Sequence, residues 1–362
     1  MRSHAMAAGR HVLWIVGPAL GHASRCLLIA RELRASHGID SHFIGSDRHG
    51  FHARLLAPDF GTTDLGCAPT DHGRFADGVL AHARQSRPGA ICIDCSPVPW
   101  MLAMPPLPAP TVYLTNHFLS HGPARTLQDD LWQQNQVPWC AERQSRGLRA
   151  IASARALYEA SLVLFCDPSS LVPQSPQPPA NAQVIGACCW TPAANLPAAL
   201  EPLQDVLFVS FGSTGRGTIP AEMLERLARV GRTTPRTVVR IDQGSIRIDD
   251  QRLPLGGFVP TPGILGRSGL ALTHGGTGST YQAMAHGVPT LVWPAHRNHH
   301  VLGERIEDLG IGVLLDPSGW TDGLARFETD FDALVSRSRA HAFDLAQGPA
   351  HGARLISELL RA

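Results

Sequence analysis

The stretch from Thr273 to Pro289, THGGTGSTYQAMAHGVP, constrains the fold most, because it predicts a strand that turns tightly into a helix. The apolar run from Leu270 to Leu272 precedes it, and we expect the helix from Ser279 to His286. The first amide groups of a helix lack partners within it and lie at the positive end of its dipole, so they bind anions. Glycines let a phosphate approach such a backbone closely, although a tight turn alone would also explain them. The candidate anion-binding residues are His274, Gly275, Gly276, Thr277, Gly278 and Ser279.

The residues after this turn continue an alternating pattern of strands and helices. Gly287-Val288-Pro289 stops the helix, Thr290 to Trp293 is expected to be a buried strand, and Asn298 to Leu309 a further helix. From Gly257 to Gly312 the chain resembles the nucleotide-sugar-dependent glycosyltransferases of family 1. Their donor signature runs His-Gly-Gly, small residues, Glu or Gln, Gly-Val-Pro, and then Pro with an Asp-Gln pair. The resemblance implies an α/β fold of the GT-B type, with two facing Rossmann-like domains and a donor diphosphate held at the His274 turn without a metal or other cofactor.

Length and charge are compatible with such a protein. A chain of 362 residues exceeds the usual size of one domain, which favours two α/β domains. The formal net charge of +1 argues against nucleic acid as the main partner. Every basic side chain apart from histidine is Arg, because the sequence contains no Lys. A P-loop lysine and a Schiff-base lysine are therefore excluded, and an anion must be held by Arg, His or backbone amides.

The cysteines and the hydropathy pattern indicate a reduced, cytoplasmic protein. Several of the eight cysteines lie in apolar runs, where a thiol behaves as a small hydrophobic side chain. Cys92 and Cys95 form a C-x-x-C, but no second pair has the spacing of a zinc site. No apolar segment is long enough to span a bilayer, and residues 1–9 are left out of the fold prediction. A monomer and a homodimer both stay open.

The N-terminal half begins with a unit that is typical of a Rossmann-like domain. We expect a strand from Val12 to Val16, a loop that ends at His22, and a helix from about Ala23 to Ser36. The solvent-exposed face of this helix is expected to include Arg25. The apolar run from Ala90 to Ile93 ends at Asp94, at the strand end where such sheets bind ligands. The resemblance implies that His22 is the general base for the acceptor hydroxyl and that Asp94 orients it. The alternatives are a histidine and an aspartate that merely cap a helix start or a loop.

The acceptor is expected to bind to loops of the N-terminal half. Residues 58–78 are rich in Gly, Asp and Thr and predict a mobile loop, and residues 141–160 predict a helix with a wet arginine face. That face is most simply solvated, and a peripheral membrane contact is the alternative. Large apolar residues in the loops suit a hydrophobic acceptor, although ordinary packing explains each of them equally well. The candidate acceptor residues are Trp100, Asn116, His117, Trp132 and Trp139.

Further donor residues follow from the resemblance. The Ser-Phe-Gly-Ser turn implies Ser213 and Thr214 near the diphosphate, and Gly257-Phe258-Val259-Pro260 implies a nucleobase that stacks on Phe258 and bonds to the backbone of Val259. Gln282 stands where many members have a Glu that binds ribose, and Asn298-His299 replaces the sugar-binding Asp-Gln pair. These departures favour a TDP-linked or deoxysugar donor. His296, His299 and His300 resemble a metal site only superficially.

We therefore predict four segments and one reaction. Residues 10–168 form the acceptor domain with Leu162 to Cys166 as its last strand, 169–204 a Pro-rich linker, 205–340 the donor domain, and 341–362 a helix that packs back on the N-terminal domain. The resemblance implies inverting transfer of a sugar from a UDP- or TDP-sugar to a hydroxyl of a small, largely apolar molecule. A nucleotide-sugar epimerase of the same architecture and a non-catalytic nucleotide-sugar-binding partner are the alternatives.

Overall fold

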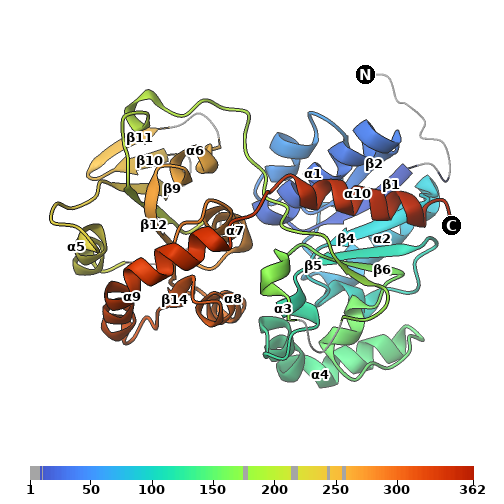
Figure 1. Cartoon of the computed structure of the whole chain (residues 1–362). Helices are drawn as coiled ribbons and strands as arrows, with labels where there is room; N and C mark the ends of the chain where they lie inside the picture. Colours follow the sequence, from blue (N-terminus) through green and yellow to red (C-terminus); the bar gives the residue numbers. More distant parts are fainter. Residues whose placement is uncertain (1–8, 10, 174–177, 213–218, 243–244, 255–257) are drawn as a thin grey trace. The chain divides into compact units, whose positions relative to one another are not determined.

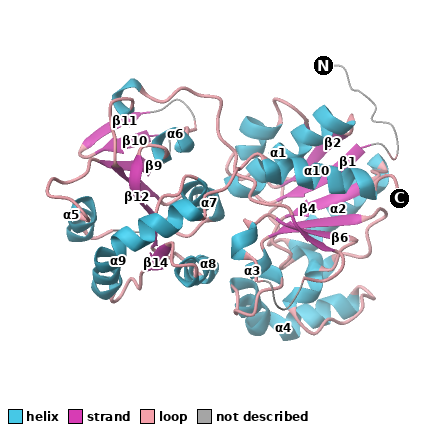
Figure 2. Cartoon of the chain, in the orientation of Figure 1, coloured by secondary structure: helices cyan, strands magenta, loops and turns pink. Residues whose placement is uncertain are grey.

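The computed structural model describes residues 9, 11–173, 178–212, 219–242, 245–254 and 258–362, which form two compact units. The first unit comprises the described residues up to Cys188 together with Ala346–Ala362, and the second comprises those from Cys189 to Leu345. Each unit contains one seven-stranded sheet with helices around it (Figures 1 and 2). Ser213, Thr214 and Gly257 of the predicted donor site lie outside the described residues.

The sheet of the first unit is built from parallel strands in the order β3-β2-β1-β4-β5-β6-β7. Its central strands β1 and β4 are buried along their whole length and are apolar apart from His11 and Asp94, as expected for parallel strands with both faces covered. Its strands are β1 (His11–Val16), β2 (Asp40–Gly45), β3 (Gly61–Asp64), β4 (Ala90–Asp94), β5 (Thr111–Thr115), β6 (Leu162–Phe165) and β7 (Ala182–Val184).

Helices cover this sheet, and the last helix of the chain belongs to the same unit. α10 (Gln347–Leu359) packs against α1, as Figure 1 also shows. A Cβ at Gly352 of α10 would lie 3.3 Å from Ile29 of α1, so the lack of a side chain there permits this close packing. The remaining helices of the unit are α1 (Leu20–His37), α2 (His72–Ser86), α3 (His117–Ser120) and α4 (Leu127–Ser145), with short helical turns at His52–Leu56, Trp100–Ala103, Ala154–Tyr158 and Ser169–Leu171.

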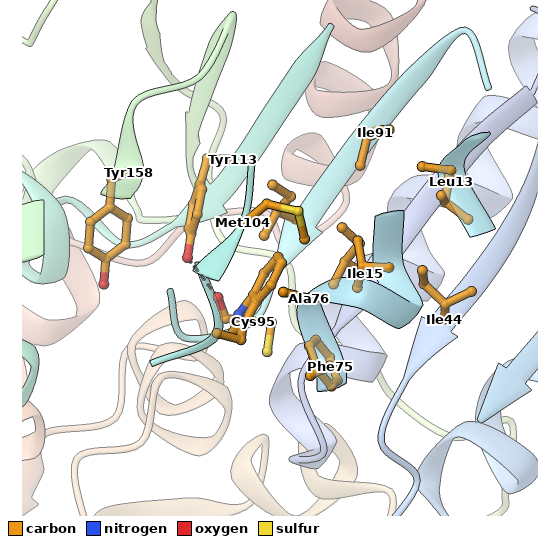
Figure 3. Close-up of a cluster of buried hydrophobic side chains, with 14 of the residues drawn as sticks. Leu13, Ile15, Ile44, Phe75, Ala76, Ile91, Cys95, Met104, Tyr113 and Tyr158 are labelled. Atoms are coloured by element: carbon orange, nitrogen blue, oxygen red, sulfur yellow. Dashed lines mark hydrogen bonds between the residues drawn. The ribbon is translucent and has the colours of Figure 1, made fainter. Parts of the chain in front are cut away.

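The core on one face of the first sheet is a cluster of aliphatic and aromatic side chains (Figure 3). Ile15 and Ile91 from the strands meet Phe75 from α2, and all three are almost completely buried. The Tyr113 hydroxyl donates to the carbonyl of Cys95 at 2.7 Å, so this buried polar group is satisfied. Burial of this apolar surface holds the strands and α2 in fixed positions.

The second sheet has the order β11-β10-β9-β8-β12-β13-β14. Its pairings are parallel except those of β9 with β10 and of β10 with β11, which are antiparallel. Its strands are β8 (Val206–Ser210), β9 (Val238–Asp242), β10 (Ser245–Ile248), β11 (Gln251–Pro254), β12 (Ser268–Thr273), β13 (Thr290–Val292) and β14 (Gly312–Leu314). Its helices are α5 (Ala221–Arg229), α6 (Thr261–Leu265), α7 (Thr277–Ala285), α8 (Arg297–Asp308) and α9 (Trp320–Ala340).

Several predicted boundaries in the chain were wrong. Residues 58–78 are not a loop throughout, because they contain β3 and the first half of α2. Residues 141–160 are not one helix but the end of α4, an irregular stretch and a helical turn. Val163 of β6 pairs with Ala182 of β7, so the strand at Leu162–Phe165 does not close the first sheet. The strands β10 and β11 were not predicted.

Each sheet has one point at which the order of its strands reverses. In the first sheet β1 lies between β2 and β4, and in the second β8 lies between β9 and β12. In open α/β sheets, the loops that follow the two strands beside such a reversal lead to opposite faces, and this leaves a crevice at the carboxyl ends of the strands. Ligands of such sheets bind there. His22 and Asp94 follow β1 and end β4, and His274 follows β12.

Candidate functional site

His22 and Asp94 form a hydrogen-bonded pair at the reversal point of the first sheet. Nδ1 of His22 lies 2.6 Å from Oδ1 of Asp94. The His22 side chain is 35% exposed, whereas that of Asp94 is only 1% exposed. A carboxylate oxygen only accepts, so Nδ1 carries the hydrogen and Nε2 of neutral His22 is left as a proton acceptor. A Cβ at Gly17 would lie 2.9 Å from the His22 ring, so this glycine makes room for it.

Arg25 binds the same carboxylate and was missed in the sequence. Its Nε and Nη2 donate to Oδ2 and Oδ1 of Asp94, each at 2.6 Å. We predicted Arg25 on the wet face of its helix, but it is only 8% exposed, because Asp94 gives the guanidinium a partner inside the protein. Burial alone would raise the pKa of Asp94, but the charges of Arg25 and His22 outweigh it and hold that pKa below its ordinary value.

Asn116 extends this polar cluster to a second buried carboxylate. Its side-chain oxygen accepts from Nη1 of Arg25 at 3.3 Å, and its Nδ2 donates to Asp167 at 2.7 Å. The backbone N–H of His117 donates to the same carboxylate at 2.6 Å, and the His117 ring packs edge-on against Phe165. Asn116 and His117 are both buried. The contacts described for these two predicted acceptor residues are therefore made to other buried residues of the first unit.

The predicted acceptor tryptophans have different environments. Trp100 is completely buried, stacks edge-on against Phe75 and donates its indole N–H to the carbonyl of Ser96. It therefore belongs to a core cluster, and its predicted contact with the acceptor stays a prediction. Trp132 and Trp139 lie on α4 rather than in a loop, with ring centroids 6.2 Å apart. Trp132 is 6% exposed and Trp139 is half-buried, so Trp139 has the more accessible ring of the two.

The turn after β12 leads directly into α7, as its sequence predicted. Gly276 is the N-cap residue of α7, and as a glycine it has no side chain with which to cap this helix start. Thr277, Gly278 and Ser279 form its first turn, which is the positive end of the helix dipole. The Ser279 hydroxyl is buried without a hydrogen-bond partner among the described residues. Backbone amides and one hydroxyl are therefore gathered at this turn.

His274 lies between two glycines of this region. A Cβ at Gly212 would come within 2.6 Å of the His274 ring, and one at Gly276 would come within 2.3 Å of its Nε2. Nδ1 of His274 lies 3.5 Å from the carbonyl oxygen of Ser210 and donates to it, since a carbonyl only accepts. Nε2 is thus the ring nitrogen next to the start of α7. Burial lowers the pKa of His274 to about 4, so the ring is neutral near pH 7.

The glycines of the turn therefore have separate structural roles. Gly275 has a φ of +84°, and a Cβ there would lie 2.8 Å from the carbonyl oxygen of His299. Only glycine fits that position without strain. Gly278, in contrast, has open space around the place of a Cβ. Gly275 and Gly276 are therefore needed for packing, whether or not an anion approaches them.

A further aromatic residue joins Gln282 and Phe258. Trp190 lies in the predicted linker, but it belongs to the second unit, and its ring meets that of Phe258 edge-on at 5.0 Å between centroids. Gln282 is buried and donates from its Nε2 to the carbonyl of Trp190 at 3.1 Å. Val259 is half-buried and packs on the edge of a core cluster. Trp190 gave no signal in the sequence apart from being an aromatic residue among prolines.

Three histidines pack together beside the turn. The rings of His296 and His299 stack at 3.6 Å between centroids, and His299 meets His274 edge-on at 4.5 Å. Burial, followed by the proximity of His274 and His296, lowers the pKa of His299. Asn298 lies in the first turn of α8 next to it. The part of the chain that the structure describes contains no group of His, Cys, Asp and Glu residues arranged to hold a metal ion.

The remaining predictions concern arginine, cysteine and hydropathy. Arg143, predicted on a wet face, is 8% exposed because it donates to the carbonyls of Leu102 and Arg149. Cys92 and Cys95 are both buried free thiols. Over the described ranges, no helix combines the length and the apolar character that crossing a membrane requires.

The sequence has relatives among glycosyltransferases. Residues 225–340 match the family described as "Erythromycin biosynthesis protein CIII-like, C-terminal domain". A PGL/p-HBAD biosynthesis glycosyltransferase of Mycobacterium tuberculosis is 29% identical over 182 residues, which cover 48% of this chain and 41% of that relative. The aligned part is thus less than half of the relative's length.

Solved structures share the whole architecture. The spinosyn forosaminyltransferase SpnP has a TM-score of 0.69 at 15% identity, covering 98% of this chain and 100% of its own. The glycosyltransferase VinC in complex with DTDP has a TM-score of 0.64 at 16% identity, covering 97% of this chain and 98% of its own. These likenesses confirm the predicted α/β fold with two Rossmann-like domains. Residues 225–340 are therefore similar to the C-terminal domain of the erythromycin biosynthesis protein CIII-like family, within a chain that shares the GT-B fold of solved natural-product glycosyltransferases.

Proposed function

We propose that this protein is a glycosyltransferase that moves a sugar from a UDP- or TDP-sugar to a hydroxyl of a small, largely apolar acceptor, with inversion at the anomeric carbon. The observation that carries the proposal is the pair of His22 and Asp94, 2.6 Å apart at the reversal point of the first sheet. The family match of residues 225–340 and the likeness to solved glycosyltransferases support it. One chain thus contains both a candidate base, His22, and a segment that is similar to the donor domain of glycosyltransferases.

The chemistry requires a base because an acceptor hydroxyl has a pKa far above neutrality. In the proposed step, Nε2 of His22 takes the hydroxyl proton while the oxygen bonds to the anomeric carbon. The bond from that carbon to the diphosphate oxygen breaks, and its electron pair leaves with the nucleotide. Asp94 keeps the hydrogen of His22 on Nδ1, where it accepts at 2.6 Å, so that Nε2 is free to receive the proton.

The leaving diphosphate is proposed to bind at the turn before α7. The amides of Thr277, Gly278 and Ser279 lie at an uncapped helix start, and Nε2 of His274 lies next to it. The amide donors stabilise the negative charge that develops as the bond breaks, and His274 adds a donor at Nε2 once its ring is protonated. The nucleobase is proposed to lie at Phe258 and Val259.

The donor is proposed to be a TDP-linked sugar, with a deoxysugar favoured over a hexose. Gln282 offers an amide where a carboxylate would bind ribose hydroxyls more strongly, and one of its N–H groups is already used by Trp190. Asn298 and His299 replace the pair that grips hexose hydroxyls in the family the sequence resembles. A solved structure with a similar fold contains DTDP.

An acceptor-dependent nucleotide-release assay with a panel of donors, combined with mass spectrometry of the products, tests this proposal. We expect transfer of a sugar to the acceptor, and higher rates with TDP-deoxyhexoses than with UDP-glucose. His22→Ala should lower kcat by about 10² to 10⁴ fold, whereas His49→Ala, at an exposed histidine of the same unit, should not. Turnover of the donor without an acceptor would indicate an epimerase instead. Binding without nucleotide release for any acceptor would refute an enzymatic role.

A further inference from the structure

The Asp94 carboxylate is shared between two basic groups. Arg25 occupies both of its oxygens through two parallel hydrogen bonds of 2.6 Å, and His22 bonds to Oδ1, which also receives Nη2 of Arg25. Planar pairing of this kind fixes the orientation of a carboxylate as well as neutralising it. Since Asp94 and Arg25 are both buried, water screens this interaction only weakly.

Arg25 changes the charge that His22 meets when it takes up a proton. An isolated pair of histidine and aspartate would go from one negative charge to none on protonation. With Arg25 included, the cluster goes from none to one positive charge. The second change is less favourable in a buried environment, because a net charge is created there instead of being removed. Arg25 thus opposes the retention of a proton on His22.

The thiols and the phenol around Asp94 and Arg25 do not compensate for this charge. Cys26, on α1, points its thiol at Oδ2 of Asp94 at 3.5 Å, and burial raises its pKa. Burial likewise raises the pKa values of Cys92 on β4, Cys95 directly after β4 and Tyr113 on β5, so these groups are neutral near pH 7. Cys166 lies near Arg25, and Asn116, which accepts from Arg25, donates to Asp167. His52 bonds to the carbonyl of Gly17 behind the His22 loop.

We propose that Arg25 is a positioning residue that orients Asp94 toward His22 and limits how strongly Asp94 retains a proton on His22. The inference rests on the proposed function, in which His22 must take a proton and release it again in every turnover. Asp94 alone would hold the acquired proton more tightly and would slow the return of the free base. With Arg25 present, His22 can both take up the proton of the acceptor and release it again.

The test is an NMR titration of the His22 imidazole in the full chain. The His22 signal is assigned as the one that is missing in His22→Gln, and the titration needs no substrate. Arg25→Gln should move the midpoint of the His22 titration up by about one pH unit, because the carboxylate is left uncompensated. Arg143→Gln removes an equally buried arginine that has only carbonyl partners, and it should leave the midpoint unchanged. A midpoint that stays in place or falls in Arg25→Gln would overturn the inference.

A second comparison serves if Arg25→Gln does not fold. Asp94→Asn leaves Arg25 without its counter-ion, so the His22 midpoint should fall, and adding Arg25→Gln should bring it back up. Equal midpoints in the single and the double variant would show that Arg25 does not act on His22.

In the transfer assay, the acidic limb of the pH profile of kcat/KM should shift to higher pH in Arg25→Gln. Arg25→Lys, which keeps the charge, should hold that limb near its original position. Absence of transfer in the unaltered protein would count against the proposed function, and the NMR result would still decide the role of Arg25.

Discussion

Two glycines at the start of α7, Gly276 and Gly278, have different physical roles. Gly276 and Gly278 are two residues apart, yet a Cβ at Gly276 would lie 2.3 Å from Nε2 of His274, while one at Gly278 meets nothing within 4 Å. Gly276 has a φ of −73°, which alanine adopts without strain. The requirement for glycine at Gly276 therefore comes from the His274 ring and not from the backbone.

The two glycines form a matched pair for mutagenesis. Gly276→Ala should displace His274 and weaken binding of TDP by about tenfold or more, because the overpacked ring must move. Gly278→Ala should raise the free energy of unfolding by about 0.5 to 1 kcal/mol, because alanine is the better helix former. Calorimetric titration and urea unfolding measure the two effects. Unchanged TDP affinity in Gly276→Ala would contradict the proposed role of His274.

His274 also predicts a proton linkage. Its Nδ1 donates to Ser210, so Nε2 of the neutral ring has no hydrogen to offer a phosphate. A bound diphosphate should favour the protonated ring and raise its pKa from about 4, so that binding takes up a proton. Calorimetry of TDP binding in buffers of different ionisation enthalpy measures this uptake. His274→Gln corrects for protons that come from the nucleotide itself, and equal uptake in both proteins would rule out the linkage.

At the scale of elements, the sequence predicted the buried strands well and the polar elements poorly. β1 and β4 are continuous apolar runs, and this pattern also located Asp94 at the end of β4. The strand β3 was missed because Gly61–Asp64 is a polar sequence at a sheet edge. The helix α4 was misplaced because it contains amides and Pro138, while its start is fixed by a capping box between Thr126 and Asp129.

The candidate site was predictable to a similar degree. His22 and Asp94 follow from a motif and from the strand-end rule, since both lie next to the sequence signals that mark them. Arg25 could not be found in this way, because helix periodicity places it among the exposed arginines and only the fold brings it to Asp94. Trp190 was missed for the same reason, since its partner Phe258 lies far along the chain.

The position of α10 gives a prediction for an element. Ile356 of α10 is completely buried in the first unit, whereas Glu358 is exposed. Ile356→Ala should lower the free energy of unfolding of the first unit by about 2 to 5 kcal/mol, and Glu358→Ala should change it by about 0.5 kcal/mol or less. Hydrogen exchange read by mass spectrometry should show faster exchange in α1 and its sheet and unchanged exchange in α9. Faster exchange confined to the second unit would contradict the assignment of α10.

At the scale of the whole molecule, buried histidines make stability depend on pH. The rings of His42 and His82 stack at 5.0 Å in the first unit. Burial, with the neighbouring His82 and His11, lowers the pKa of His42 to about 4. A histidine whose pKa is lower in the folded than in the unfolded chain stabilises the fold only while it is neutral. This contribution is complete above about pH 6.5 and is lost as the pH falls toward about 4.

Acidification should therefore weaken the first unit before any carboxylate is protonated. Between about pH 7 and about pH 5, we expect a loss of about 1 to 2 kcal/mol in the free energy of unfolding from His42, reduced from the full shift because the ring is only half-buried. Urea unfolding at the two pH values measures it. His42→Gln should reduce the dependence by this amount, and the exposed His49→Gln should retain it. An identical dependence in both variants would assign the effect to other groups.

The measurement that tests the central claim most directly is a crystal structure of the chain with bound TDP. The account predicts phosphate oxygens within about 3 Å of the amides of Thr277, Gly278 and Ser279, with Nε2 of His274 beside them. It also predicts the nucleobase against Phe258. A diphosphate bound away from the start of α7, or no binding of TDP or UDP at millimolar concentration, would contradict the account.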